Sequence, residues 1–396
     1  MPSTTPARFE WITDPDQFLA LRDDWNLLAS SVVDNIFLTH AWLANWLKEL
    51  APKAELHVLT AREGERLVAA LPLFGGQHTG TGRHWRIMGT GVLTPNHLDI
   101  ISDPAFVGQA RTGFADLLLE ESANWDVLEF DKLPADSGTV EAFASAFAQA
   151  GLATSCSESA VCYVCDLPPT YEEYLASRSK NTRKKIGETR RWLVKQPESV
   201  RLALADTEEA SLHALESLER FHQERWAAKG YPGAFADPRV VRFHDAEVRA
   251  ALTSGNLRMY TLSDGDEILA VSYNYRIGAT AQAYLTSFDS NWSKASPGVL
   301  LRAFVIEQSI AEGATLFDWL EGAESYKKAW CTHELTDLRL LVYGRNLSGR
   351  VAHFKHSSNV TAVRLARRWI SPALRERAVR LLTRLRSSGQ SARSDS

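Results

Sequence analysis

The sequence predicts an α+β protein built from two similar halves. The chain has 396 residues, more than one hydrophobic core usually organises, so two domains are expected. Segment 56–74 (LHVLTAREGERLVAALPLF) aligns without gaps on segment 257–275 (LRMYTLSDGDEILAVSYNY), 201 positions later. An apolar helical pattern and a buried strand follow each segment, within 114–130 and 300–320. Any two β-hairpins share some features, but the ungapped turn and the common downstream order favour an internal duplication.

Composition and charge exclude several classes of protein. The hydrophobic share of 45% and the charged share of 23% are ordinary for a globular protein. A formal charge of −4 argues against a globally basic nucleic-acid binder, so no DNA partner is expected. The sequence has no run of 18 apolar residues, and its start, MPSTTPARFEW, lacks a charged-then-apolar signal pattern. We therefore expect a cytoplasmic protein.

The first half is expected to span residues 1–167 and to end near Pro168-Pro169. Its apolar periodicity predicts helices within 13–50, strands at 56–60 and 67–74, a helix at 114–119 and a buried strand at 127–130.

Cys162 and Cys165 form a C-x-x-C pair, a pattern found in redox sites and in halves of zinc sites. No further ligands lie nearby in the sequence. The alternating pattern VCYVCDL predicts a strand that sends the two side chains to opposite faces. We therefore expect buried structural thiols and no metal.

A basic segment, residues 168–200, is expected to connect the halves. Within it, 171–195 predicts an amphipathic helix that docks on the protein through an apolar face. Its opposite face carries Lys180, Arg183, Lys184 and Arg191. Such a face suits a polyanion such as a lipid diphosphate or RNA, and a solvated charged surface is the alternative.

The second half, residues 201–347, contains the most informative stretch, 293–330. Ser296 is expected as a helix N-cap, and Pro297 fits the first turn because its fixed φ suits a helix. Gly298 leaves the first amide groups uncovered by a side chain. A helix start of this kind binds anions through free N–H groups and the helix dipole.

An acid–base group is expected at the end of the next strand. The apolar helix ends at Gly313, and the apolar run at 316–320 predicts a short buried strand. Asp318 and Glu321 lie at the end of this strand, and Tyr326 follows on the next turn. Two carboxylates and a tyrosine in this order can move protons during a reaction.

Residues 348–396 are expected to form an arginine-rich helical tail. From 363 onward the sequence has nine arginines against Glu376 and Asp395. Apolar residues at helical spacing favour a surface helix over a disordered end. An anionic surface such as the inner membrane, or a partner protein, is the expected contact.

Taken together, these motifs resemble a known family, the GNAT acyltransferases of the CelD/BcsL type, which are similar in fold to FemAB peptidyltransferases. The resemblance covers about residues 10–345 and rests on the two-half layout, the basic segment RSKNTRKKIGETRRWL and three patterns. These patterns are His222-x-x-x-Trp226-x-x-x-Gly230, Ser296-Pro297-Gly298 and Asp318-x-x-Glu321-Gly322-x-x-x-Tyr326-Lys327-x-x-Trp330. One departure is that SKASPG replaces the usual glycine-rich phosphate loop.

The resemblance implies two tandem GNAT-like domains, each a mixed sheet flanked by helices. It implies transfer of an acyl group from acetyl-CoA or another acyl-CoA to an amine or hydroxyl acceptor, by direct attack on the thioester. Members of the group are associated with exopolysaccharide or cellulose production. The expected cofactor-binding residues are Ser296, Pro297, Gly298, Val299 and Lys327.

Within this mechanism, Tyr326 is the expected acid for the departing thiolate, and Asp318 or Glu321 is the expected base or acceptor anchor. Each has a structural alternative. Tyr326 can be the edge of a core, and the carboxylates can pair with Lys327, Lys328 or a backbone amide.

On the acceptor side, His222 is a further candidate base, although a histidine on a helix face often serves packing. The candidate acceptor-binding residues are Arg183, Lys184, Arg225 and Trp226.

Two other functions compete with acyl transfer from acyl-CoA. One is FemAB-type aminoacyl transfer from charged tRNA, to which the basic segment would contribute. The other is a non-catalytic accessory role, in which the tail docks on a polysaccharide synthase. Motifs of serine hydrolases, zinc peptidases, P-loop NTPases and dinucleotide-binding enzymes are missing from the sequence.

Overall fold

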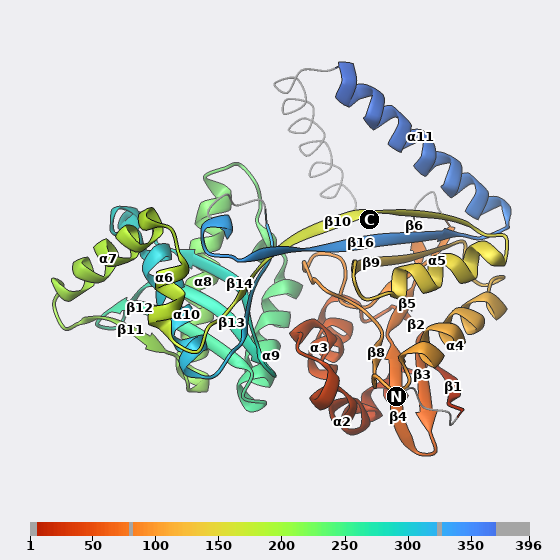
Figure 1. Cartoon of the computed structure of the whole chain (residues 1–396), viewed down its shortest axis with the longest axis horizontal. Coiled ribbons are helices and arrows are strands. Elements are labelled where there is room, and N and C mark those ends of the chain that lie inside the picture. The colour runs from red at the N-terminus through yellow and green to blue at the C-terminus, as the bar shows by residue number, and fades with distance from the viewer. Residues whose placement is uncertain (1–5, 79–81, 323–326, 370–396) are drawn as a thin grey trace.

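The computed structural model describes residues 6–78, 82–322 and 327–369, arranged as two lobes joined by long strands (Figure 1). The N-terminal half comprises β1 (Arg8–Ile12), α1 (Pro15–Ala20), α2 (Arg22–Val32), the 3-10 helix η1 (Ile36–Leu38), α3 (His40–Leu50), β2 (Glu55–Leu56), β3 (Val58–Glu63), β4 (Arg66–Leu71), β5 (Leu73–Gly75), β6 (Gln77–His78), β7 (Gly82–Ile87), β8 (Ile101–Ser102), α4 (Val107–Glu120), β9 (Val127–Pro134), α5 (Thr139–Gln149) and β10 (Ala153–Asp166).

The C-terminal half begins after β10. It comprises α6 (Tyr171–Ser177), α7 (Lys180–Val194), β11 (Val200–Leu204), α8 (Glu208–Ala227), η2 (Ala234–Ala236), α9 (Pro238–Thr253), β12 (Leu257–Asp264), β13 (Glu267–Ile277), β14 (Thr280–Phe288), η3 (Ser290–Ala295), α10 (Pro297–Ala311), β15 (Leu316–Glu321), η4 (Lys327–Ala329), β16 (His333–Tyr343) and α11 (Leu347–Trp369). The rest of the arginine-rich tail lies outside the described residues.

The two hairpins aligned in the sequence have the same geometry. In β3–β4, Ala61 faces Ala69 and a β-bulge follows Ala61; in β12–β13, Leu262 faces Ala270 and a β-bulge follows Leu262. The two turn glycines, Gly64 and Gly265, share φ 58°, a left-handed conformation that glycine adopts without strain. Register, bulge and turn therefore recur at the same offset, which supports the predicted duplication.

One mixed sheet runs through both halves, in the order β11-β12-β13-β14-β15-β10-β16-β9-β7-β5-β2. The long strands β10 and β16 make this continuity possible. They pair with each other from Ala153↔Tyr343 to Val164↔His333. One end of β10 also pairs with β15, and one end of β16 also pairs with β9 (Figure 1). The last described strand, β16, thus extends the sheet of the N-terminal half.

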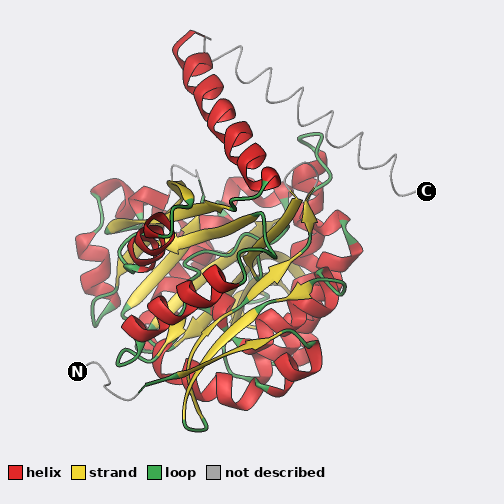
Figure 2. Ribbon diagram, turned by 90° about the vertical axis from the view of Figure 1, so that its right-hand side faces the viewer, coloured by secondary structure: helices red, strands yellow, loops and turns green. Residues whose placement is uncertain are grey.

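Helices cover both faces of this sheet (Figure 2). In the C-terminal half, alternation along β12 sends Met259 into the core under α8 and α9 and Tyr260 into the core under α6, α7 and α10. The halves also meet through helices, because Trp42 of α3 stacks edge-on against Phe243 of α9, with ring centroids 4.8 Å apart. The predicted α+β class, with mixed sheets flanked by helices, is confirmed.

Three predicted elements differ in detail. The basic segment forms two helices instead of one, because Arg178 is extended and the Ser179 hydroxyl accepts a hydrogen bond from the backbone N–H of Thr182 at 3.1 Å, which starts α7 afresh. The strand predicted at 67–74 divides at Pro72, which has no N–H to donate to a ladder. The strand predicted at 56–60 divides at His57 into β2 and β3.

The domain boundaries at 167, 200 and 347 remain predictions. The chain changes element near each of them, since β10 ends at Asp166, β11 begins at Val200 and α11 begins at Leu347. The described helices include none that is both long enough and apolar enough to cross a membrane.

Candidate functional site

The strands β14 and β15 separate to form a wedge. They pair in parallel from Thr280↔Leu316 to Gln282↔Asp318, and no further pair joins them. A cavity of about 190 Å³ opens where they diverge, lined by β14 residues 283–286, β15 residues 319–321 and the side chains of Asn96, Arg225 and Arg302, among others. On the β14 edge, the backbone groups that face β15 beyond Gln282 have no partner strand and are available to a ligand.

A second cavity, of about 570 Å³, adjoins the wedge. Its lining comprises Thr94, Val161, Tyr163, Glu321 and Gly322. Thr94 and Glu321 line both cavities. Glu321 therefore stands between a space beside the strand edges and a second space between the halves.

Residues of the N-terminal half hold Glu321 in place. Its backbone N–H donates to Asn96 Oδ1 at 3.1 Å, and its carboxylate forms an ion pair with the Lys132 ammonium. Lys132 has φ 65°, and its carbonyl accepts a hydrogen bond from the backbone N–H of Leu98 at 2.8 Å. The Glu321 side chain remains 28% exposed, so solvent and ligands reach it.

Asp318 is part of a different arrangement, centred on His97. Its Oδ1 accepts a hydrogen bond from the backbone N–H of Leu320 at 2.8 Å, and its Oδ2 lies 3.2 Å from His97 Nε2. The other ring nitrogen, Nδ1, lies 2.8 Å from Asp337 Oδ1. Burial by itself would lower the pKa of His97, but its bonds to Asp318 and Asp337 outweigh burial and raise the pKa well above its usual range. Asp318 is therefore the partner of a largely buried imidazolium.

Asp318 therefore pairs with a backbone amide, which is the structural alternative given for it above. It also pairs with His97, which the sequence did not indicate. It is only 3% exposed and lines a third cavity, of about 310 Å³, together with His97 and Gln282. Glu321, with its accessible carboxylate, is the better placed of the two candidate bases.

His222 is occupied by its neighbour. Its Nε2 accepts a hydrogen bond from the Trp226 indole N–H at 2.9 Å, and burial lowers its pKa. The ring is therefore neutral at pH 7, with the proton on Nδ1 beside Gln223 Oε1 at 3.4 Å. This geometry agrees with the packing alternative for His222, while the exposed Arg225 lines the wedge.

The start of α10 is more enclosed than the sequence suggested. Ser296 occupies the N-cap position, but it has φ 53° and its hydroxyl makes no capping bond, which corrects the expected side-chain cap. Its carbonyl accepts hydrogen bonds from the backbone N–H groups of Val299 and Leu300. Pro297 and Gly298 are buried, and a Cβ at Gly298 would lie 3.4 Å from an Arg302 guanidinium nitrogen. Arg302 therefore lies beside the start of α10 and also lines the wedge cavity.

Lys327 faces the backbone. Its ammonium donates to the carbonyls of Trp319 at 2.9 Å and Glu321 at 2.7 Å, and the residue is 6% exposed. It therefore fixes the end of β15, and a phosphate contact stays a prediction. Tyr326 lies outside the described residues.

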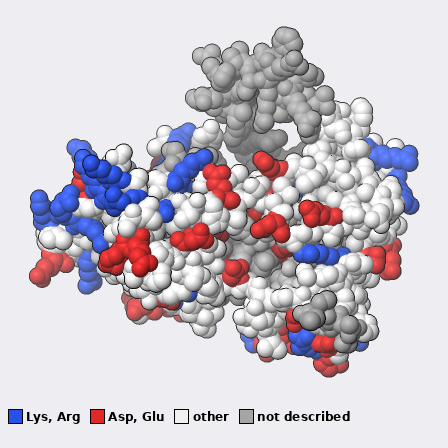
Figure 3. All heavy atoms as spheres, viewed as in Figure 1, with Lys and Arg blue, Asp and Glu red and all other residues white. Residues whose placement is uncertain are grey.

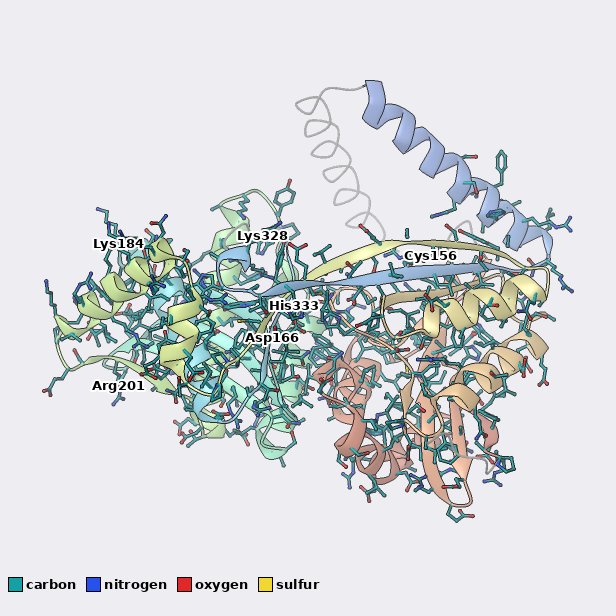
Figure 4. All side chains as sticks on the ribbon, in the orientation of Figure 1. Cys156, Asp166, Lys184, Arg201, Lys328 and His333 are labelled. Atoms are coloured by element: carbon teal, nitrogen blue, oxygen red, sulfur yellow. The ribbon has the colours of Figure 1, made fainter. Side chains whose placement is uncertain are left out.

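Arg183 and Lys184 lie on α7, at the outer end of the C-terminal half, where Lys and Arg gather (Figures 3 and 4). The Arg183 guanidinium donates to the carbonyls of Ala176 and Arg178, and Lys184 forms an ion pair with Glu188 at 3.8 Å. Neither is among the described residues that line the three cavities.

The cysteine pair follows the prediction. Cys162 and Cys165 are both buried and unbonded to each other, and they belong to different surroundings, one beside Asp337 and the other in the core with α6. His97, Cys162 and Asp337 offer donor atoms within 4.8 Å of one another, the spacing of a metal site. Because the backbone N–H and Nδ1 of His97 both bond to Asp337, hydrogen bonding already accounts for this cluster.

Comparison with known proteins bears on this geometry. Residues 180–328 match the family model of the acetyltransferase (GNAT) domain. This GNAT match covers α7 through β15, the segment that contains the wedge and Glu321. It indicates transferase chemistry without identifying donor or acceptor.

Solved structures share the fold over most of the chain. FemX superposes with a TM-score of 0.61 at 10% identity, over 86% of this chain and 98% of its own. A conserved protein from Bacteroides thetaiotaomicron superposes with a TM-score of 0.52 at 13% identity, over 85% of this chain and 99% of its own. L-PGS from Bacillus licheniformis superposes with a TM-score of 0.51 at 10% identity, over 83% of this chain and 94% of its own. No curated protein matches the sequence.

The residues that sequence reasoning missed are Asn96, His97, Lys132 and Arg302. The first three belong to the N-terminal half and meet β15 across more than 180 positions of sequence. No local pattern encodes such contacts. Arg302 could have been predicted from the sequence, because it follows Gly298 by one helical turn.

Proposed function

We propose that this protein is an acyltransferase that moves an acyl group from acetyl-CoA or another acyl-CoA to an amine or hydroxyl acceptor. The observation that carries the proposal is the position of Glu321, which borders both the wedge and the 570 Å³ cavity. A donor in one cavity and an acceptor in the other would meet at this carboxylate.

Glu321 acts as the general base in this proposal. It takes the acceptor proton while the acceptor nitrogen or oxygen attacks the thioester carbonyl, and the carbon–sulfur bond then breaks. The departing thiolate takes a proton from Tyr326, the candidate acid. The ion pair with Lys132 orients the Glu321 carboxylate.

The donor lies along the diverging strand edges. Backbone groups of 283–286 have no partner strand on the side of β15, so they suit the amide groups of an extended thiol cofactor. The diphosphate then falls near the Arg302 guanidinium, which supplies positive charge beside the start of α10 at Ser296, Pro297, Gly298 and Val299.

The acceptor belongs to exopolysaccharide or cellulose production in this proposal, in line with the resemblance to the CelD/BcsL type. The 570 Å³ cavity has room for a sugar-sized group beside Tyr163, and aromatic rings are common partners of sugars.

Calorimetric titration with acetyl-CoA and longer acyl-CoAs tests the donor. Saturable binding that a Glu321→Gln variant retains, together with turnover reduced about 10²–10⁴-fold, supports the assigned role. Glu172→Gln on the exposed face of α6 is the matched control and should keep full turnover. Unchanged turnover in Glu321→Gln would remove the residue from the chemistry.

A second candidate donor is charged tRNA, favoured by the exposed basic face of α7. Lys180, Arg183 and Lys184 are all exposed there, and Figure 3 shows the positive patch that they help to form. Salt-dependent binding of charged tRNA, in the absence of acyl-CoA binding, would select this candidate. If neither donor binds, the accessory role is favoured.

A further inference from the structure

A cleft separate from the wedge opens between the two halves. It has a volume of about 380 Å³ and lies among α2, α3, α9 and β13. Exposed polar residues form its mouth: Asn26, Ser30 and Ser254. Its walls are apolar, with Ala29, Ile36, Ala251 and Ile277 all less than 9% exposed. Its lining shares no residue with the wedge or with the 570 Å³ cavity.

Glu247 of α9 lines this cleft and has one carboxyl oxygen without a partner among the described residues. It is 1% exposed, and its Oε2 accepts a hydrogen bond from Asn45 Nδ2 at 3.0 Å. Its Oε1 is buried and has no hydrogen-bond partner among the described residues. A buried carboxyl oxygen without a donor is costly, so native structures usually provide a partner for it.

The surroundings of Glu247 supply no positive charge. Asn45 on α3 is neutral, and burial lowers the pKa of His244, one turn earlier on α9, to about 3. The tyrosines facing Glu247 from β13 and β14 (Tyr273, Tyr275 and Tyr284) have pKa values raised by burial and stay neutral. Burial raises the pKa of Glu247 itself to about 8, against the Asn45 hydrogen bond.

The nearest cations of α9 are engaged elsewhere. Arg242 pairs with Glu49, and Arg249 pairs with Glu208 and Asp245. Among the described residues, Oε1 therefore has neither a cation nor a hydrogen-bond partner. A ligand that fits a polar mouth, apolar walls and a carboxyl group in the lining is an N–H donor at the end of a hydrocarbon chain.

We propose that this cleft binds a linear primary alkylammonium ion, with Glu247 as its counter-ion. The ammonium donates to Oε1, and the alkyl chain lies against the walls formed by α2 and α9. Because the cleft lies between elements of both halves, the bound cation joins α2 to α9. The proposal does not depend on the acyl-transfer chemistry.

Calorimetric titration of the full chain with n-butylammonium chloride tests the proposal. We expect saturable binding at pH 7, accompanied by proton release, because a largely protonated Glu247 must ionise to pair with the cation. Repeating the titration in buffers of different ionisation enthalpy measures the released proton. Tetramethylammonium chloride has equal charge and no N–H group, so it should bind at least about tenfold more weakly.

Two variants locate the binding. Glu247→Gln should weaken butylammonium binding about tenfold or more and abolish proton release. Ser30→Trp closes the mouth from an exposed position, keeps Glu247 and should also weaken binding, whereas Ser31→Trp, also exposed and next along α2, is the matched control. No saturable binding, or equal affinity in wild type, Glu247→Gln and Ser30→Trp, would overturn the proposal.

Discussion

His97 and Asp337 are bonded twice across 240 positions of sequence. The ring Nδ1 of His97 lies 2.8 Å from Asp337 Oδ1, and its backbone N–H donates to Oδ2 at 3.0 Å. On its other side the same ring pairs with Asp318 of β15. One histidine therefore links a loop of the N-terminal half to two strands of the shared sheet, beside the residues that hold Glu321.

The first prediction concerns this link. His97→Ala leaves two buried carboxylates without their cation, so the free energy of unfolding should fall by about 3–5 kcal/mol. Urea denaturation followed by circular dichroism measures the change. The exposed His213→Ala is the matched control and should stay within about 0.5 kcal/mol of wild type. A loss as small as that of the control would show that the pairing contributes little.

The second prediction concerns pH. The pKa of His97 is raised above its unfolded value of 6.5, so its contribution to stability is complete below that pH and is lost as pH rises toward the folded pKa. The difference in unfolding free energy between wild type and His97→Ala should shrink above pH 6.5, by up to about 1.4 kcal/mol per pH unit. Denaturation curves between about pH 6 and pH 9 measure it. A difference that grows with pH would contradict a charged His97.

The third prediction concerns Tyr326. Tyr326→Phe should keep the fold and lower acyl transfer about 10²-fold or more, because the thiolate loses its proton donor. Steady-state turnover with acetyl-CoA is the measurement. Tyr171→Phe is the matched control, since its buried hydroxyl has no hydrogen-bond partner among the described residues. Full turnover in Tyr326→Phe would instead assign Tyr326 a packing role at the edge of the core.

The fourth prediction concerns α11, which extends away from the two lobes (Figure 1). Leu347 and Phe354 are 79% and 74% exposed on this helix, and the sequence beyond it is rich in arginine. Sedimentation with phosphatidylglycerol vesicles should show binding that high salt weakens, with little binding to phosphatidylcholine vesicles. Phe354→Ser should reduce the binding about tenfold, since burying a phenylalanine side chain is worth about 1.5–3 kcal/mol. The control Leu27→Ser replaces an exposed leucine on α2 and should leave vesicle binding unchanged. Equal binding to both vesicle types would exclude an electrostatic membrane contact.

The order of elements was accessible from the sequence alone. The hairpins at 56–74 and 257–275, the helix beginning at Pro297 and the strand ending at Glu321 all follow from periodicity, turn residues and breakers, which act over a few neighbouring positions. Glu321 itself was found this way, because a carboxylate at a strand end is a local pattern. The two cysteines were placed on opposite faces for the same reason.

Only the tertiary structure decided which of these residues can act. Asp318 and Glu321 look equivalent in the sequence, yet His97 engages one and Lys132 holds the other beside two cavities. His222 looked available until Trp226 was seen to occupy its acceptor nitrogen. Local patterning determines how each segment folds, whereas the partners of a buried charge come from segments brought together by packing. The shared strands β10 and β16 create that packing, and no periodicity within either strand reveals it.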